Sequence, residues 1–339
     1  MVEGYKYDQY ITSLGGGTGH FTFLRGVVKL NNPEKITAIA STWDSGGSSG
    51  NLRVKEGTLP MGDYMQNIFG LMEDEEQLQE AIIILRDRSG GDPLVNLLAS
   101  KAEKAHHGIE GGIEGLRRLF RIRGRVIPVN LVDTDLNAET RNGNVFTREH
   151  LIDHMGDDPR FVLQDELARI YLDPPVSANP RALEAIEQGD KVVFTAGSPF
   201  TSIFPHLLVE GVADAVLNSK SRLIAVLNLM TSNGEDRHLT TASRWLQVFQ
   251  EYLGDHDWIS KTNHSRIDYL IVNQNHFDER LLEFYLNQGQ KPIKIDEEEC
   301  AKLAPGMKII SRNLVTYDHR AHLLRHDSIK LAQTILGLA

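Results

Sequence analysis

Two glycine-rich segments near the start of the chain, each directly after a strand-like run, constrain its fold more than any other feature. The first, Gly15-Gly16-Gly17-Thr18-Gly19, follows the short apolar run 10–14. The second, residues 44–50, follows the β-branched run 36–42. Apolar residues at helical spacing occupy part of the interval between them. A β-loop-α-β opening of this kind is typical of a parallel α/β sheet.

Strand-like and helical runs continue to alternate along the rest of the chain. We therefore expect an α/β, Rossmann-like fold with a mostly parallel sheet and helices on both faces. A helical stretch at about 63–123 is predicted to form an insertion. Since no linker or repeat divides the sequence, residues 1–339 are interpreted as a single domain. Further buried strands are expected at 125–132, 191–195, 223–229, 267–272 and 292–295.

The overall charge and the cysteine content narrow the class of protein. A net charge of −10 argues against binding to nucleic acid or to an anionic membrane, both of which favour basic patches. Cys300 is the single cysteine, so no intrachain disulfide forms and a reducing compartment is indicated. The start lacks the pattern of a signal peptide, and no apolar run is long enough to span a bilayer. We expect a cytoplasmic protein, with a homodimer through the helical insertion as one option.

The first glycine-rich segment predicts a phosphate site. Small residues at Gly15–Gly19 let the backbone approach a ligand, and N–H groups at a helix N-terminus favour phosphate oxygens. A dinucleotide fingerprint needs a third glycine at the position of His20. An NAD(P)-dependent oxidoreductase is therefore the weakest of three functional hypotheses, and no NAD(P) cofactor is expected.

The second segment and the residues after it offer further anion and cation ligands. Asp44 stands where dinucleotide enzymes hold the ribose, whereas the following residues suit an anion nest, namely Ser45, Gly46, Gly47, Ser48, Ser49 and Gly50. Arg53 adds a planar donor fork that matches phosphate. Asp63 is either a helix N-cap or a carboxylate that faces the same crevice. In the second case Asp44 and Asp63 are candidate Mg²⁺ ligands, together with phosphate oxygens.

Two later loops also follow predicted strands, where ligands of open α/β sheets bind. We expect all these loops to meet at one crevice. The candidate ligand-binding residues in the two later loops are Gly197, Ser198, Thr201, Ser202, Asn228, Thr231, Gly234 and Glu235.

Taken in order, these motifs resemble those of the YvcK/CofD-like family, also called UPF0052. Gly15–Gly19 and Asp44–Arg53 look like the family's GGGTG and DDGGSSGxLR motifs. Segment 60–63 is similar to PPGD, segment 197–202 to GSLYTS, and segment 228–235 to NxMTxxGET. Arg325-His326-Asp327 resembles an RHD motif near the family's C-terminus, which makes Arg325 a candidate ligand-binding residue.

The resemblance implies two alternative functions. The YvcK branch is linked to UDP-sugar binding and to control of cell-wall synthesis, cell shape and central carbon metabolism. The CofD branch implies a Mg²⁺-dependent transferase that moves a 2-phospholactate-like group from a nucleoside diphosphate conjugate to an acceptor, with Asp44 and Asp63 as catalytic residues. The forms of the loop motifs favour the YvcK branch. Two departures bear on metal binding, because Ser45 replaces the family's second Asp and Met65 replaces an Arg.

Overall fold

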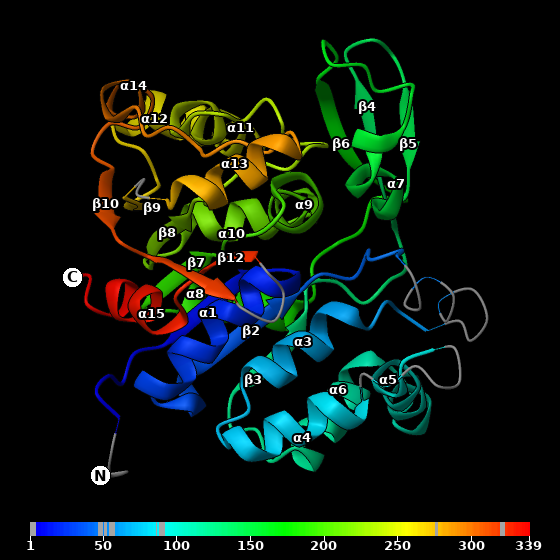
Figure 1. Cartoon of the computed structure of the whole chain (residues 1–339). Helices are drawn as coiled ribbons and strands as arrows, with labels where there is room; N and C mark the ends of the chain where they lie inside the picture. The colour runs from blue at the N-terminus through cyan, green and yellow to red at the C-terminus, as the bar shows by residue number, and fades with distance from the viewer. Residues whose placement is uncertain are drawn as a thin grey trace.

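The computed structural model describes residues 5–46, 50, 53, 58–85, 87, 92–274, 277–318 and 323–339. At its centre lies a seven-stranded sheet in the order β10-β9-β8-β7-β1-β2-β3, and every neighbouring pair is parallel (Figure 1). Its strands are β1 (Ile11–Gly15), β2 (Ile36–Ala40), β3 (Arg125–Pro128), β7 (Lys191–Phe194), β8 (Arg222–Val226), β9 (Tyr269–Asn273) and β10 (Lys308–Arg312). The expected mostly parallel, Rossmann-like sheet is confirmed.

Helices cover both faces of this sheet. Helix α15 packs against α1, so the last helix of the chain lies beside the first (Figure 1). On this face lie α1 (Gly17–Leu30), α3 (Gly62–Gly70) and α15 (Ser328–Leu336). Toward the other face lie α8 (Pro180–Gln188), α9 (Pro205–Leu208), α10 (Val212–Asn218), α11 (Ala242–Leu253), α12 (Asp255–Thr262) and α14 (Glu297–Leu303).

Alternation along the strands divides the apolar interior into two cores. In β8, Leu223 and Ala225 join the core of one face, whereas Ile224 and Val226 join the core of the other. All four side chains are at most 1% exposed. A strand buried on both faces reads as a continuous apolar run, which is why the sequence marks these strands without alternation.

Two further units lie outside the central sheet. The helical insertion contains α4 (Glu75–Leu85), α5 (Leu94–Ala105) and α6 (Ile109–Leu119), and its apolar residues belong to the same core as α1 and α3. The second is a three-stranded antiparallel sheet of β4 (Asp135–Thr140), β5 (Val145–Thr147) and β6 (Leu167–Asp173). Short helix α7 (Glu149–Asp153) follows β5, and Figure 1 shows this unit at one end of the molecule.

One predicted strand is wrong. Residues 292–295 make only isolated bridges, Pro292 to Met230 and Lys294 to Thr241. The outer strand of the sheet is β10 instead, which lies after α14 and pairs with β9. It carries Lys308 and Arg312 at its ends, and this mixed composition does not stand out as a buried strand. The remaining elements are α13 (Glu279–Asn287) and the hairpin of β11 (Val315–Asp318) and β12 (Leu323–His326). Among the described residues, no helix is long and apolar enough to cross a membrane.

Candidate functional site

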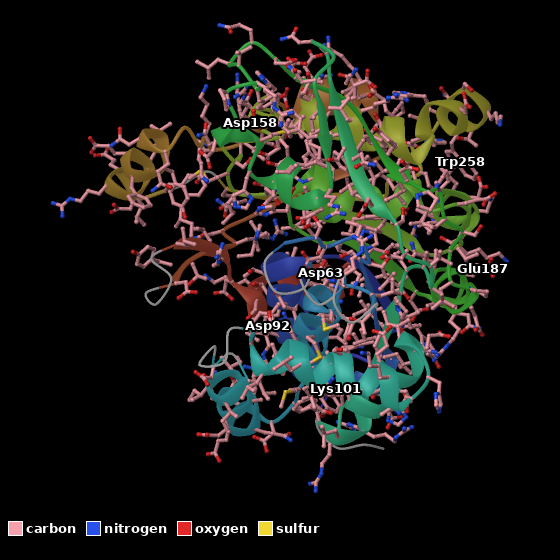
Figure 2. All side chains as sticks on the ribbon, turned by 90° about the vertical axis from the view of Figure 1, so that its right-hand side faces the viewer. Asp63, Asp92, Lys101, Asp158, Glu187 and Trp258 are labelled. Atoms are coloured by element: carbon pink, nitrogen blue, oxygen red, sulfur yellow. The ribbon has the colours of Figure 1, made fainter. Side chains whose placement is uncertain are left out.

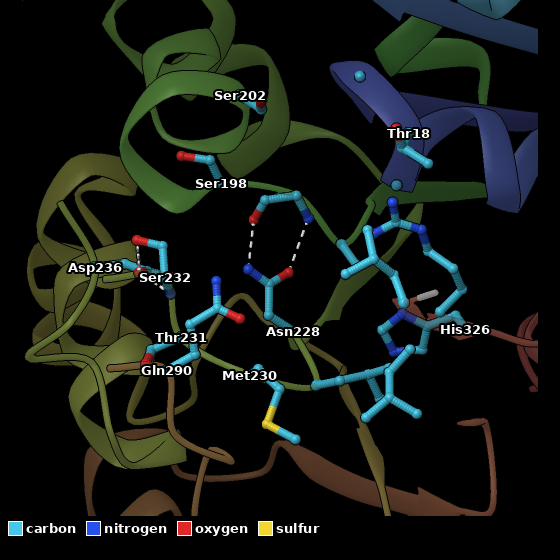
Figure 3. Close-up of a pocket in the computed structure, with 18 of the residues that line it drawn as sticks. Thr18, Ser198, Ser202, Asn228, Met230, Thr231, Ser232, Asp236, Gln290 and His326 are labelled. Carbon is cyan, nitrogen blue, oxygen red and sulfur yellow. Dashed lines mark hydrogen bonds between the residues drawn. The ribbon is translucent and has the colours of Figure 1, made fainter. Parts of the chain in front are cut away.

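A cavity of about 390 Å³ opens at the carboxyl end of the sheet. It lies where β1 separates β2 on one side from β7 on the other, which is the point at which open α/β sheets bind ligands. Loops after β1, β7 and β8 form its walls together with β12 (Figure 3). Polar and small residues dominate the lining, which includes Gly16, Gly17, Thr18, Gly19, Thr22, Asp153, Gly197, Ser198, Ser202, Asn228, Thr231, Ser232, Glu235, Asp236, Tyr285, Gln290, Arg325 and His326.

The first glycine-rich segment brings the N-terminus of α1 to this cavity. Gly17 begins the helix with φ of +60°, a conformation that favours glycine. A Cβ atom at Gly19 would lie 1.9 Å from the carbonyl oxygen of Ala196, so only glycine lets α1 approach the loop after β7 this closely. The first turn of a helix presents N–H groups that suit an anion. The wall at Gly16–Gly19 therefore has the geometry of a phosphate site.

The side chain of His20 stabilises this turn. Its ring is fully buried, with Nε2 2.8 Å from Ser13 Oγ and Nδ1 3.1 Å from the Gly15 carbonyl oxygen. The carbonyl can only accept, so Nδ1 carries the proton and Nε2 accepts from the serine. Burial lowers the pKa of His20 to about 3, which keeps the ring neutral. The residue that breaks the dinucleotide fingerprint is thus a structural anchor of the turn.

The loops after β7 and β8 are joined through Asn228. Its Oδ1 accepts from the Gly197 N–H at 2.9 Å, and its Nδ2 donates to the Gly197 carbonyl at 2.7 Å (Figure 3). Ser198 caps the following π-helical turn Pro199–Ile203, because its Oγ accepts from the Thr201 N–H. Thr201 itself is buried, and its carbonyl accepts from Trp43 Nε1. It supports the wall, whereas Ser198 and Ser202 line the cavity.

The C-terminal hairpin supplies another wall of the cavity. Arg325 and His326 of β12 line the cavity, and Figure 3 shows His326 on the same side as Thr18. The N–H of Leu324 donates to Tyr285 Oη at 2.7 Å, which ties the hairpin to α13. Within the described residues, the buried atoms Arg325 Nε and His326 Nε2 have no hydrogen-bond partner. Burial lowers the pKa of His326 to about 4, so its ring is neutral at neutral pH.

Asp63 lies beneath the turn into α1, near the middle of the molecule (Figure 2). Its Oδ1 accepts from the Gly17 N–H at 2.7 Å, and its Oδ2 accepts from Ser41 Oγ. Burial and the charge of Asp44 raise the pKa of Asp63 to about 6. Burial, together with the charges of Asp44 and Asp153, raises the pKa of Glu149 to about 9.

These carboxyl groups allow a test of the predicted Mg²⁺ site. No group of three or more metal-ligating side chains of the kind found in closed protein sites occurs among the described residues. Asp44 and Asp63 lie close enough for the charge of one to raise the pKa of the other, and a cation relieves such repulsion. Mg²⁺ is commonly held by one or two carboxylates plus substrate phosphates. Neither carboxylate is among the residues that line the cavity, and both oxygens of Asp63 accept hydrogen bonds from the protein, so the metal role of this pair stays a prediction.

The structure places the second glycine-rich segment toward α7. Ser45 Oγ accepts from the His150 N–H at 2.9 Å, and the Gly46 N–H donates to Asp44 Oδ1. Gly50 donates to the Gly46 carbonyl, while Gly47, Ser48 and Ser49 lie outside the described residues. Arg53 bonds instead to Asp133, Thr134 and Asp135, with its Nε 2.7 Å from Asp133 Oδ1. Its predicted contact with phosphate would require these ion pairs to open.

Several residues of the cavity escaped sequence reasoning. Asp153, Tyr285 and Gln290 come from α7, α13 and the segment after α13, which are distant in sequence from the glycine-rich loops. A helical pattern gives no sign that one of its residues faces a ligand. Ser232 and Asp236 lie within the polar loop after β8, whose composition is their only sequence signal.

Comparison with known proteins identifies the family. The model of the family described as 2-phospho-L-lactate transferase CofD matches residues 11–315. This chain belongs to the CofD family. Among its relatives is a Thermotoga maritima protein described as a putative gluconeogenesis factor. It is 33% identical to this chain over 328 residues, which cover 96% of this chain and 98% of that protein. The gluconeogenesis factor of Bacillus subtilis is 28% identical over 333 residues, covering 97% of each chain.

Solved structures agree with the CofD-family assignment. A Bacillus halodurans protein described as a member of the UPF0052 family superimposes with a TM-score of 0.84 at 29% identity. The match covers 98% of this chain and 99% of that chain. The family and the fold expected from the sequence motifs are both confirmed.

Proposed function

We propose that this CofD-family protein binds a nucleoside-diphosphate conjugate, with a UDP-sugar as first candidate, and acts as a YvcK-type regulator of carbon metabolism and cell-wall synthesis. One observation carries the proposal: the N-terminus of α1 and Arg325 of β12 both line the cavity at the strand ends. Arg325 Nε is buried there without a partner among the described residues. A diphosphate bound in this cavity would receive N–H donors from the start of α1 and a guanidinium from Arg325.

The remaining lining suits the rest of such a ligand. Asn228, Thr231 and Ser232 offer amide and hydroxyl groups, and Tyr285 offers an aromatic ring. A regulatory role needs no turnover, and we assign no nucleophile to the site. The cavity of about 390 Å³ falls within the size range of small-molecule sites.

Calorimetric titration tests the proposal. We expect saturable binding of UDP-N-acetylglucosamine or another UDP-sugar, and weaker binding of a guanosine diphosphate conjugate. Arg325→Gln removes the positive charge and should weaken binding by about tenfold or more. Arg312→Gln is the matched control, because Arg312 is an exposed arginine at the end of β10 and is not among the residues that line the cavity. Absence of binding to every one of these conjugates refutes the proposal.

A second candidate, a Mg²⁺-dependent transferase of the CofD type, is favoured by the Asp44 and Asp63 pair. When bound with the substrate phosphates, Mg²⁺ would stabilise negative charge on the leaving nucleoside monophosphate. Asp63 would also hold the Gly17 N–H in place at the start of α1. The expected result is that the protein releases nucleoside monophosphate only when Mg²⁺ is present, and that this release is lost in Asp63→Asn. Release that persists in this variant removes Asp63 from the reaction.

A further inference from the structure

Two carboxyl groups are buried next to each other in the wall of the cavity. Glu235 and Asp236 are 3% and 2% exposed, and both belong to the loop after β8. Ser232 lies between them. Its Oγ is 2.6 Å from Asp236 Oδ1 (Figure 3). The same Oγ is 3.2 Å from Glu235 Oε2. On the other side, Ser198 Oγ donates to Glu235 Oε1 at 2.6 Å.

The hydrogen atoms available for hydrogen bonds among Ser232, Glu235 and Asp236 can be counted. The Ser232 hydroxyl has one hydrogen, and the shorter contact assigns it to Asp236. Ser232 Oγ also accepts from the Gly234 N–H at 3.0 Å. An ionised carboxylate can only accept, so the contact between Glu235 Oε2 and Ser232 Oγ is a hydrogen bond only when Glu235 carries a proton.

The surroundings decide which carboxyl group holds that proton. Asp236 Oδ1 accepts from both the Ser232 hydroxyl and the Ser232 N–H, and two donors stabilise its ionised form. Glu235 accepts a side-chain hydrogen bond from Ser198 at its other oxygen. Burial, followed by the charges of Asp236 and Asp153, raises the pKa of Glu235 well above its ordinary value.

We infer that Glu235 and Asp236 hold one proton between them, carried on Glu235, and that this proton sets the charge of the wall that an anionic ligand meets. The inference rests on the proposed function for its effect on binding. With the proton present, the wall carries one negative charge fewer, and Glu235 continues the chain of donors from Ser198 to Asp236. Loss of the proton leaves two adjacent buried carboxylates, which repel a diphosphate.

Other charged groups face Glu235 from both sides. Asp153 of α7 and Arg325 and His326 of β12 share the ligand cavity with it. Glu235 also forms part of the wall of a second cavity of about 160 Å³, between β6 and α11. The titratable groups there are Arg141, Glu166, His238, Arg244, Glu251 and Tyr252. These groups are present both in wild type and in a Glu235 variant, so the difference between the two reports on Glu235 together with its interaction with Asp236.

Infrared spectroscopy of the ligand-free protein tests where the proton lies. We expect a protonated-carboxyl C=O band near neutral pH that disappears in alkali and is missing from Glu235→Gln. Asp236→Asn removes the neighbouring negative charge, so the band should disappear at a lower pH than in wild type. Loss of the band at the same pH as in wild type would show that this charge does not hold the proton on Glu235. Glu251→Gln, in the second cavity, is the control and should keep the band. A band that survives unchanged in Glu235→Gln overturns the inference.

Titration with UDP-N-acetylglucosamine across neutral and alkaline pH tests the consequence for binding. In wild type the affinity should fall by about tenfold per pH unit above the pKa of Glu235, with proton uptake on binding. In Glu235→Gln this part of the pH dependence should vanish, whereas Glu251→Gln should follow wild type. An identical pH profile in Glu235→Gln refutes the inference. If no UDP-sugar binds at all, the proposed function fails, while the infrared result still decides the location of the proton.

Discussion

At the scale of single residues, the glycines of the first loop and His20 support the turn into α1 in different ways. Gly19 is required because no side chain fits between α1 and the Ala196 carbonyl. Gly17 is required for its positive φ, although the space around a Cβ there is open. His20 bonds to Ser13 and Gly15 and fixes the turn that these glycines allow.

Gly19→Ala should therefore be more destabilising than Gly17→Ala. A Cβ at Gly19 forces α1 away from the loop after β7, and overpacking of this kind costs about 3 kcal/mol. At Gly17 the cost is the left-handed conformation, about 1 kcal/mol. Urea unfolding measures both free energies. Equal losses in the two variants would show that α1 can shift without penalty.

His20 should make the protein less stable in acid. Its folded-state pKa of about 3 lies below its ordinary value of 6.5, so its contribution is complete above pH 6.5 and is lost as the pH falls toward 3. Near pH 5 the unfolded chain binds about one proton more at this site, which corresponds to about 1.4 kcal/mol per pH unit.

Unfolding free energies measured across this pH range, in wild type and in His20→Asn, check the prediction. The variant should have the shallower slope, whereas Asn in place of the exposed His256 should leave the slope as in wild type. The buried His206 and His326 contribute equally to each protein compared. Parallel curves for wild type and His20→Asn would contradict the prediction.

At the scale of elements, the site depends on contacts between loops that follow different strands. Asn228 joins the loop after β8 to the loop after β7, and Tyr285 joins α13 to the C-terminal hairpin. Arg53 joins the segment after β2 to the start of β4. Such contacts position the walls of the cavity relative to one another.

Asn228→Ala should weaken both folding and binding. It leaves the N–H and the carbonyl of Gly197 without their side-chain partner, at a cost of about 1–3 kcal/mol. The loop after β7 should lose its fixed position, and we expect the Kd for UDP-N-acetylglucosamine to rise by about tenfold.

Thermal unfolding and calorimetric titration measure the two effects. Asn218→Ala serves as the control, because exposed Asn218 donates only to the carbonyl of Asp214 in its own helix. If Asn228→Ala loses no more stability than Asn218→Ala, the link between the loops is dispensable.

At the scale of the whole molecule, the helical insertion shares its core with the sheet. Leu78 of α4, Ala99 of α5 and Leu116 of α6 are at most 1% exposed and belong to the same apolar cluster as Phe23 and Leu24 of α1. A unit that shares a core with its host does not have a core of its own to fold around. The interpretation of residues 1–339 as a single domain remains a prediction.

Unfolding should then occur in one transition. Trp43 and Trp245 are each 1% exposed and report on the core of the second face, whereas far-ultraviolet circular dichroism reports on all helices, including those of the insertion. We expect the two signals to change at the same urea concentration. Loss of helical signal before the tryptophan signal would indicate that the insertion unfolds independently.

Much of the fold could be predicted from the sequence because its signals are local. Strands β1, β2, β7, β8 and β9 are buried on both faces and read as apolar runs. Strand β10 could not be recognised, because an edge strand is half-exposed and carries charge. Its pairing with β9 joins two segments that are distant in the sequence, which no local pattern encodes.

By itself, the sequence determined the glycine-rich loops, the parallel architecture and the family, since these depend on residues close together along the chain. Only the tertiary structure decided which polar groups face one another. It placed Arg53 against Asp133 and Asp135, His20 beneath the turn, and Glu235 beside Asp236 and Ser232. Side-chain partners and burial fix charge and protonation, and both arise only when distant strands and helices are packed together.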